Sequence, residues 1–158
     1  MGNYRRIFLD GHSYFLTIVT HQRNPILIDN IALLRESFRI SKLRYIYTID
    51  AIVILPDHFH MIITPKIVEE YPHIVRTIKQ YFSKNCDPKY YTHIEQSASR
   101  AKEGYSPIWQ KKYFEHTIRN EKDLQEKLVY MYHNPVKHKW VERCDEWKYS
   151  SFCNMGGR

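Results

Sequence analysis

The chain has 158 residues, enough for one domain spanning positions 1–158, and its apolar share of 43% excludes wholesale disorder. No apolar run approaches the roughly 20 residues that a bilayer-crossing helix needs, and three cysteines without CxxC spacing exclude a disulfide framework and predict a cytoplasmic location. Because 24 Lys and Arg oppose 17 Asp and Glu, and 13 tyrosines are present, we expect a polyanionic partner, single-stranded nucleic acid rather than closed duplex.

Alternating apolar patterns predict strands, and apolar residues at helical spacing predict helices. The first expected elements in chain order are a strand over His12–Thr20 and a helix capped by Asp29 or Asn30 that runs to about Leu43. Strands over Arg44–Leu55 and His58–Thr64 follow, and then a helix from Ile67 to about Asn85. The last two are a strand over Tyr113–Ile118 and a helix that Asn120 caps and Pro135 ends.

The order of these elements, β-α-β-β-α-β-α, is a split βαβ pattern with an added helix. It predicts an α+β domain with a ferredoxin-like (RRM-like) antiparallel sheet. The polar, patternless stretch Cys86–Pro107 is expected to be a long loop. The tail over residues 136–158 is rich in aromatic residues, and we expect it to pack onto the domain.

His58 and His60 are two residues apart at the start of an apolar strand, so both imidazoles project from one face while Phe59 is buried on the other. At that spacing two imidazoles can share one divalent metal. A His-x-His pair also arises by chance among nine histidines, and most such pairs are solvated or satisfied by neighbours.

The last predicted helix adds a second group of polar residues. Tyr130 and Asn134 are four residues apart, and Lys127 lies beside them, off the apolar stripe of Leu124, Leu128 and Met131. On spacing alone, the simpler interpretation is a surface tyrosine and an asparagine that terminates the helix before Pro135.

Taken together, two imidazoles and one amide oxygen suit Mg²⁺ or Mn²⁺ working as a Lewis acid on a phosphodiester. A tyrosine attacking that phosphate would form a covalent phosphotyrosine, which keeps the energy of the broken bond and makes the step reversible.

Several blocks of the sequence resemble one known family, the REP-associated tyrosine transposases, a branch of the IS200-like single-tyrosine HUH transposases. LPDHFH (Leu55–His60) looks like the HUH motif, and YMYHNPVKHKW (Tyr130–Trp140) is similar to the signature of the tyrosine helix. IWQKKYFEHTIRNEKD (Ile108–Asp123), NYRRIF (Asn3–Phe8) and WKYSSF (Trp147–Phe152) resemble the family's preceding, opening and closing segments. The blocks follow the family order over nearly the whole chain.

The resemblance implies an HUH endonuclease fold, with His58 and His60 as metal ligands, Asn134 as the third ligand and Tyr130 as the nucleophile that forms a 5′-phosphotyrosine. It implies a single-stranded DNA hairpin, the repetitive extragenic palindrome (REP), as the substrate, with a tetranucleotide at its foot. A DNA-reading arm over residues 1–10 is then expected.

Within that arm, Tyr4, Arg5 and Arg6 are the candidates for base or phosphate contacts, and Lys127 on the tyrosine helix is a further candidate for DNA contact. A disordered basic arm that adds affinity without specificity is the alternative. Monomer and homodimer stay open.

Three functions remain in competition. The first is a metal-dependent transposase that cleaves and rejoins single-stranded DNA, the second is a silent binding module on the same fold, and the third is a phosphohydrolase that uses water, with Tyr130 structural. Two histidines without a nearby cysteine are an incomplete zinc set.

Overall fold

The computed structural model describes residues 12–104 and 106–153. The predicted DNA-reading arm, including Tyr4, Arg5 and Arg6, lies outside these residues. None of the described helices is both long and apolar enough to cross a membrane.

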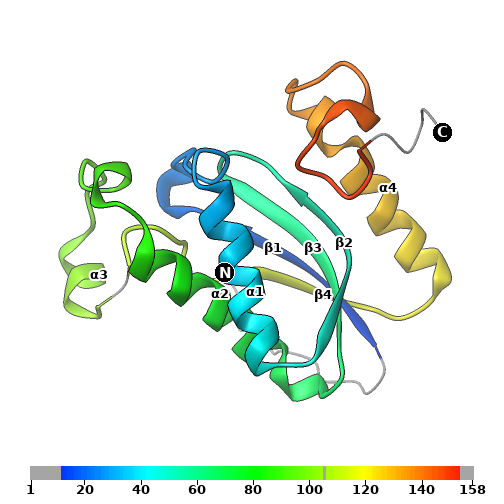
Figure 1. Ribbon diagram of the computed structural model, residues 1–158, viewed down its shortest axis with the longest axis horizontal. Helices are drawn as coiled ribbons and strands as arrows, with labels where there is room; N and C mark the ends of the chain where they lie inside the picture. The colour runs from blue at the N-terminus through cyan, green and yellow to red at the C-terminus, as the bar shows by residue number, and fades with distance from the viewer. Residues whose placement is uncertain (1–11, 105, 154–158) are drawn as a thin grey trace.

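Four antiparallel strands form one sheet in the order β2-β3-β1-β4 (Figure 1). The strands are β1 (Ser13–Val19), β2 (Tyr47–Ile54), β3 (His58–Pro65) and β4 (Phe114–Ile118). The two central strands, β1 and β3, face each other through pairs such as Thr17 with His60 and Val19 with His58. This arrangement confirms the predicted ferredoxin-like α+β fold.

Helices α1 (Ile31–Arg44) and α2 (Tyr71–Asn85) cover one face of the sheet (Figure 1). Every second residue of β1, from Tyr14 to Ile18, enters the apolar core between the sheet and these helices. This core contains most of the buried aromatic and aliphatic side chains of the described chain.

The bounds of the elements on this face differ in part from those expected. The predicted strand start at Arg44 is wrong, because α1 continues to that residue and β2 begins at Tyr47. Asn30 holds the N-cap position of α1, but its amide donates to the carbonyl of Ile26 (2.8 Å), so the side-chain cap is not formed. The helix expected from Ile67 begins with a separate 3-10 turn before α2.

Helix α4 (Glu121–Lys137) lies on the opposite face of the sheet (Figure 1). Met131 is fully buried with apolar side chains of β1, β2 and β3, and Leu124 and Leu128 pack against the same cluster. Asn120 caps the helix as predicted, its side chain accepting a bond from the backbone N–H of Asp123 (2.8 Å).

Pro135 does not end α4, contrary to expectation. The helix runs two residues further, and the N–H of His138 still bonds the carbonyl of Asn134 (3.1 Å). A proline in the last turn removes only its own bond to the carbonyl four residues earlier, so the turn survives.

The stretch Cys86–Pro107 is not wholly irregular. It contains a 3-10 turn (Pro88–Tyr90) and the short helix α3 (Ala98–Lys102), and it extends beyond the end of the sheet (Figure 1). Five helical residues are too few to produce an apolar periodicity, which is why the sequence pattern did not reveal them. The guanidinium of Arg100 donates to the carbonyls of Ser106 (2.8 Å) and Trp109 (3.1 Å) and so attaches this excursion to the segment before β4.

The tail after α4 returns to the sheet at the outer edge of β2. The indole of Trp147 donates to the carbonyl of Ile54 (2.7 Å), and the backbone N–H of Ser151 donates to the carbonyl of Ile52 (2.9 Å). The sheet edge formed by β2 is therefore covered by the tail, whereas β4 is the edge strand on the other side.

Candidate active site

A cavity of about 630 Å³ opens between the sheet and α4, at the start of β3 where the two predicted metal-binding histidines lie. Its polar lining comes from four parts of the chain, namely β1, the 3-10 turn after it, β3, and residues 126–138 of α4 and its C-cap. The polar residues that matter below are Thr17, Arg23, His58, His60, Tyr130 and His138.

His58 is buried, and its ring is oriented by a carboxylate. Its Nδ1 lies 2.7 Å from Oδ1 of Asp57, which also pairs with Arg23 (3.5 Å). A nitrogen that donates to a carboxylate carries the proton, so Nε2 of His58 presents its lone pair. Burial lowers the pKa of His58, and the neighbouring Asp57 opposes this shift only in part.

His60 has a comparable partner on the adjacent strand. Its Nδ1 is 2.7 Å from the hydroxyl oxygen of Thr17, whereas its Nε2 is buried and has no hydrogen-bond partner. Burial, with electrostatic repulsion from the nearby His58 as a smaller cause, lowers the pKa of His60 to about 3, so the ring is neutral at physiological pH. Neutral imidazoles are the form that binds metal ions.

Tyr130 stands at the mouth of the cavity. The centroid of its ring is 5.3 Å from that of His60 and 6.1 Å from that of Phe15, and the residue is 41% exposed. The ammonium of Lys137 lies 5.4 Å from the centre of the Tyr130 ring. The predicted nucleophile is therefore beside the histidine pair and within reach of solvent.

Asn134 is fully buried, and neither its amide oxygen nor its amide nitrogen has a hydrogen-bond partner. It does not contribute to the cavity surface, but Tyr130, one turn before it, and His138, one turn after it, both do. A buried amide without a partner is unfavourable by about 1–3 kcal/mol, so a ligand for its oxygen would remove a real penalty.

Lys127 also lines the cavity, as expected, but its ammonium is held 3.5 Å from Asp123. Asp123 in turn bonds the ring of His116 (2.7 Å), which keeps that histidine away from the candidate site. The ammonium of Lys127 therefore contributes one positive charge to the rim of the cavity.

His138 is the residue that sequence reasoning missed. It is not among the predicted site residues, yet its ring centroid is 5.3 Å from that of His58. Tyr130, Asn134 and His138 recur at intervals of four residues, and this spacing was the available signal. Asp57 and Arg23 were missed as well, because a carboxylate that orients a histidine leaves no periodic pattern.

Two tyrosines close to Tyr130 in the sequence do not line this cavity. Tyr132 is half-buried against Phe152, with ring centroids 5.6 Å apart, and Tyr113 is buried on the other face of the sheet. Trp109 packs in the core on that other face, since it is 3% exposed and its indole donates to the carbonyl of Lys79 (3.1 Å).

A divalent metal fits the atoms that are present. Within residues 12–104 and 106–153, no group of three or more His, Cys, Asp or Glu side chains could hold a metal ion. A metal on the two imidazoles would therefore need a third ligand of another type, and an amide oxygen such as that of Asn134, which has no partner, is of a suitable chemical type.

Comparison with known proteins gives one consistent result. The family described as IS200-like transposases matches residues 9–133. A protein of Haemophilus influenzae named as a REP-associated tyrosine transposase is 38% identical over 154 residues, which cover 96% of this chain and 86% of that protein. The REP-associated tyrosine transposase of Escherichia coli K12 is 32% identical, with 96% and 83% covered.

A solved structure has the same architecture. It is that of a REP-associated tyrosine transposase bound to a REP hairpin, and it superposes with a TM-score of 0.81 at 31% sequence identity. The superposition covers 100% of this chain and 87% of that one.

Proposed function

The chain belongs to the family of IS200-like transposases, in its REP-associated tyrosine branch, and from this premise we propose that it cleaves and rejoins single-stranded DNA through Tyr130. As a member of that branch it is a DNA transposase. The observation that carries the proposed mechanism is the position of the Tyr130 ring beside that of the buried His60, in a cavity that the buried His58 also lines.

In the proposed reaction the phenolic oxygen of Tyr130 attacks the phosphorus of the scissile phosphodiester. The phenol gives up its proton as the new bond joins its oxygen to phosphorus, the bond from phosphorus to the 3′ oxygen breaks, and the 3′ oxygen leaves and takes up a proton. The upstream fragment is released with a 3′-hydroxyl, and the downstream fragment stays attached through its 5′ phosphate as a phosphotyrosine, so a 3′-hydroxyl can reverse the step without an external energy source.

The residues of this chain contribute positioning and charge. Helix α4 holds the phenol at the cavity mouth, Asp57 and Thr17 fix the two imidazole rings, and the cations of Lys137 and Arg23 face the place that an anionic phosphate would occupy. These residues lie together within one copy of the chain.

We propose Mg²⁺ or Mn²⁺ as the metal, held by His58, His60 and Asn134. The fit is supported by the unpartnered buried atoms on His60 and Asn134. When bound, such an ion supplies Lewis-acid polarisation of the scissile phosphate.

The proposed partner is a single-stranded DNA hairpin of the REP type. Support comes from the structural neighbour, which is bound to a REP hairpin, and from the net charge of +7. A protein that neutralises several phosphates loses affinity steeply as salt rises, so hairpin binding should weaken with salt.

The test uses hairpins labelled at the 5′ or the 3′ end, incubated with protein and Mn²⁺ and separated on a denaturing gel. The wild type should form a covalent adduct that carries the downstream fragment, and Tyr130→Phe should lower its formation by at least about a thousandfold. Tyr132→Phe is the matched control, because it removes the same hydroxyl two residues away and outside the cavity.

Two outcomes would contradict the proposal. Retarded but uncut DNA with the wild type would favour a silent binding module. Cleavage without an adduct, equal in Tyr130→Phe, would favour a phosphohydrolase that uses water.

A further inference from the structure

We propose that a second groove, on the other side of strand β4 from the candidate active site, binds the single-stranded DNA that flanks the cleavage point. This inference rests on the proposed function, because it says where the single-stranded DNA goes after it leaves the active-site cavity. The occupant is a stretch of unpaired nucleotides, recognised by phosphate charge and by base contact.

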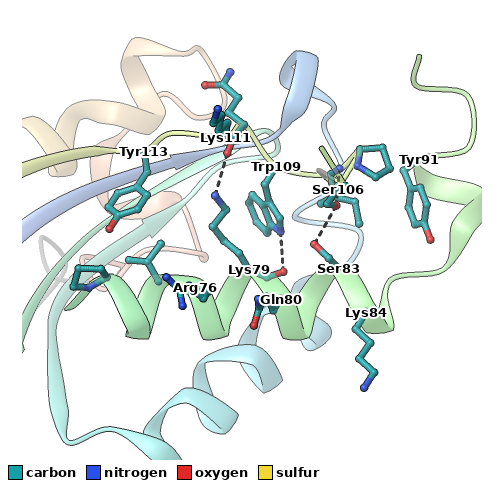
Figure 2. Close-up of a pocket in the computed structure, with 16 residues that line it drawn as sticks. Arg76, Lys79, Gln80, Ser83, Lys84, Tyr91, Ser106, Trp109, Lys111 and Tyr113 are labelled. Atoms are coloured by element: carbon teal, nitrogen blue, oxygen red, sulfur yellow. Dashed lines mark hydrogen bonds between the residues drawn. The ribbon is translucent and has the colours of Figure 1, made fainter. Parts of the chain in front are cut away.

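The groove lies between α2 and the segment that precedes β4, and its volume is about 870 Å³ (Figure 2). Three hydrogen bonds attach the segment to the helix, as Figure 2 shows. Lys79 donates to the carbonyl of Gln110 (3.0 Å), the indole of Trp109 donates to the carbonyl of Lys79 (3.1 Å), and the hydroxyls of Ser106 and Ser83 are 3.3 Å apart. The two walls are thus held at a fixed separation before any ligand arrives.

The charge of the groove is of one sign. Four cationic side chains line it, and no Asp or Glu is among the described lining residues. The cations are Arg76, Lys79, Lys84 and Lys111. Lys79 and Lys111 are engaged by protein groups, the latter 3.7 Å from Glu103, whereas Arg76 and Lys84 lie on an exposed edge of α2.

Arg76, Gln80 and Lys84 are spaced four residues apart, so they form one stripe along α2. Eight residues of helix correspond to about 12 Å. A stripe of donors over that length suits the phosphates of an extended strand better than a single small anion.

The inner surface of the groove is apolar and aromatic. Trp109 and Ile108 are buried beneath it, Tyr113 is almost completely buried beside them, and the ring of Tyr91 forms part of the end wall with partial exposure (Figure 2). Aromatic and apolar surface inside a cationic rim is the combination that single-stranded nucleic acids use, because bases stack while phosphates meet charge. A closed duplex has no unstacked bases to place there.

The groove and the active-site cavity lie on either side of the point where the chain enters β4. Successive side chains of extended chain point to opposite faces, so Tyr113, just before β4, lines the groove while Phe114, its first residue, lines the cavity. Gln110 is bonded to Val19 of β1, and the two lysines that follow it, Lys111 and Lys112, are exposed between the two pockets. Since β4 is the edge strand of the sheet, a DNA strand can pass from one pocket over these lysines into the other.

The experiment compares hairpins that share one cleavage site but carry either a short flank or a flank lengthened by about ten unpaired nucleotides, on the 5′ or the 3′ side. Affinity is measured by fluorescence anisotropy, and the readout is the ratio of affinities for long and short substrates. The wild type should gain at least about tenfold from one of the two lengthened flanks.

In the double variant Arg76→Gln/Lys84→Gln this gain should fall to about twofold or less, and the salt dependence of long-flank binding should become shallower by roughly one unit of slope. Arg35→Gln/Arg44→Gln is the matched control, since it removes two exposed arginines of α1 that line neither pocket, and it should keep the gain. Tyr91→Leu should also reduce the gain, whereas Tyr91→Phe should retain it because the ring remains. Thermal unfolding checks that each variant is folded.

The proposal is overturned if neither flank increases wild-type affinity, or if the groove and control variants lose the gain equally. Failure of the proposed function would appear elsewhere, as the absence of a Tyr130-dependent adduct on the short substrate with the wild type.

Discussion

The two faces of the sheet differ in what they bury. Among the described residues, 22 buried apolar side chains form the cluster beneath α1 and α2, whereas six form the cluster beneath α4. The α4 face instead carries His58, His60 and Asn134, whose polar atoms are buried and in part without partners. One face therefore stabilises the fold, and the other retains the unsatisfied groups that a ligand can use.

Removing a large side chain from each face is the strongest way to test this difference. Phe82 is fully buried with its ring 5.2 Å from that of Trp109, so Phe82→Ala should lower the free energy of unfolding by about 3–5 kcal/mol in urea titrations. Phe114 lines the active-site cavity and is 56% exposed, so Phe114→Ala should change the stability by less than about 0.5 kcal/mol while weakening DNA binding. Equal losses of stability in both variants would contradict the comparison.

Metal affinity should respond to a residue that does not touch the metal. Asp57 orients His58 through its Nδ1, so Asp57→Asn should weaken Mn²⁺ binding about 10- to 100-fold in isothermal titration calorimetry. Asp50→Asn, which changes an exposed carboxylate on β2 that bonds Thr48 and Thr64, should leave Mn²⁺ affinity unchanged.

The pH dependence of stability should also separate the two faces. The pKa of His60 is about 3 in the folded protein and 6.5 in the unfolded chain, so below pH 6.5 the unfolded state binds a proton that the folded state refuses. In metal-free protein the contribution of His60 should therefore lower the free energy of unfolding by about 2 kcal/mol between pH 7 and pH 5, with further loss toward pH 3.

His60→Asn should make this dependence shallower, because an amide does not titrate. Urea unfolding at pH 7 and at pH 5 measures both proteins, and identical slopes would show that the buried imidazole is not the cause. A similar but smaller contribution comes from His58, whose pKa is also lowered by burial.

The smallest expected effect concerns the anchoring of α4. Asn120→Ala removes the side-chain bond to the N–H of Asp123 and should lower the free energy of unfolding by about 1 kcal/mol in urea titrations. Asn120→Asp keeps an acceptor at the same place and should restore most of that loss. A loss as large as that of Phe82→Ala would mean that the α4 face contributes more to stability than its small core indicates.

The fold could be predicted because its elements carry local periodic signals. The alternation in His12–Thr20 and the stripe of Leu124, Leu128 and Met131 identify a strand and a helix face without tertiary information. Pro135 and α3 were mispredicted for a local reason too, since a proline in a last turn and a helix of five residues both depart from the patterns that define long helices.

The candidate site was predictable only where two of its residues share one element. His58 and His60 share a strand, and Tyr130 and Asn134 share a helix, but the contact of His60 with Thr17 depends on the register between β1 and β3. The approach of His138 to His58 also depends on how α4 docks on the sheet, so the four-residue spacing from Asn134 could suggest His138 but could not establish this contact. The metal-binding and nucleophilic roles of these residues stay predictions until the experiments above are done.

The path of the chain around α4 has a consequence for how Tyr130, the predicted nucleophile, is held. The chain enters this helix from β4 at one edge of the sheet and leaves it into a tail that bonds to β2 at the other edge. Both ends of the helix are therefore attached to the sheet that carries His58 and His60. A frameshift that ended translation before Trp147 would preserve Tyr130, His58, His60 and Asn134 and still remove one of the two supports. Loss of this support is expected to change how α4, and with it Tyr130, is held against the sheet.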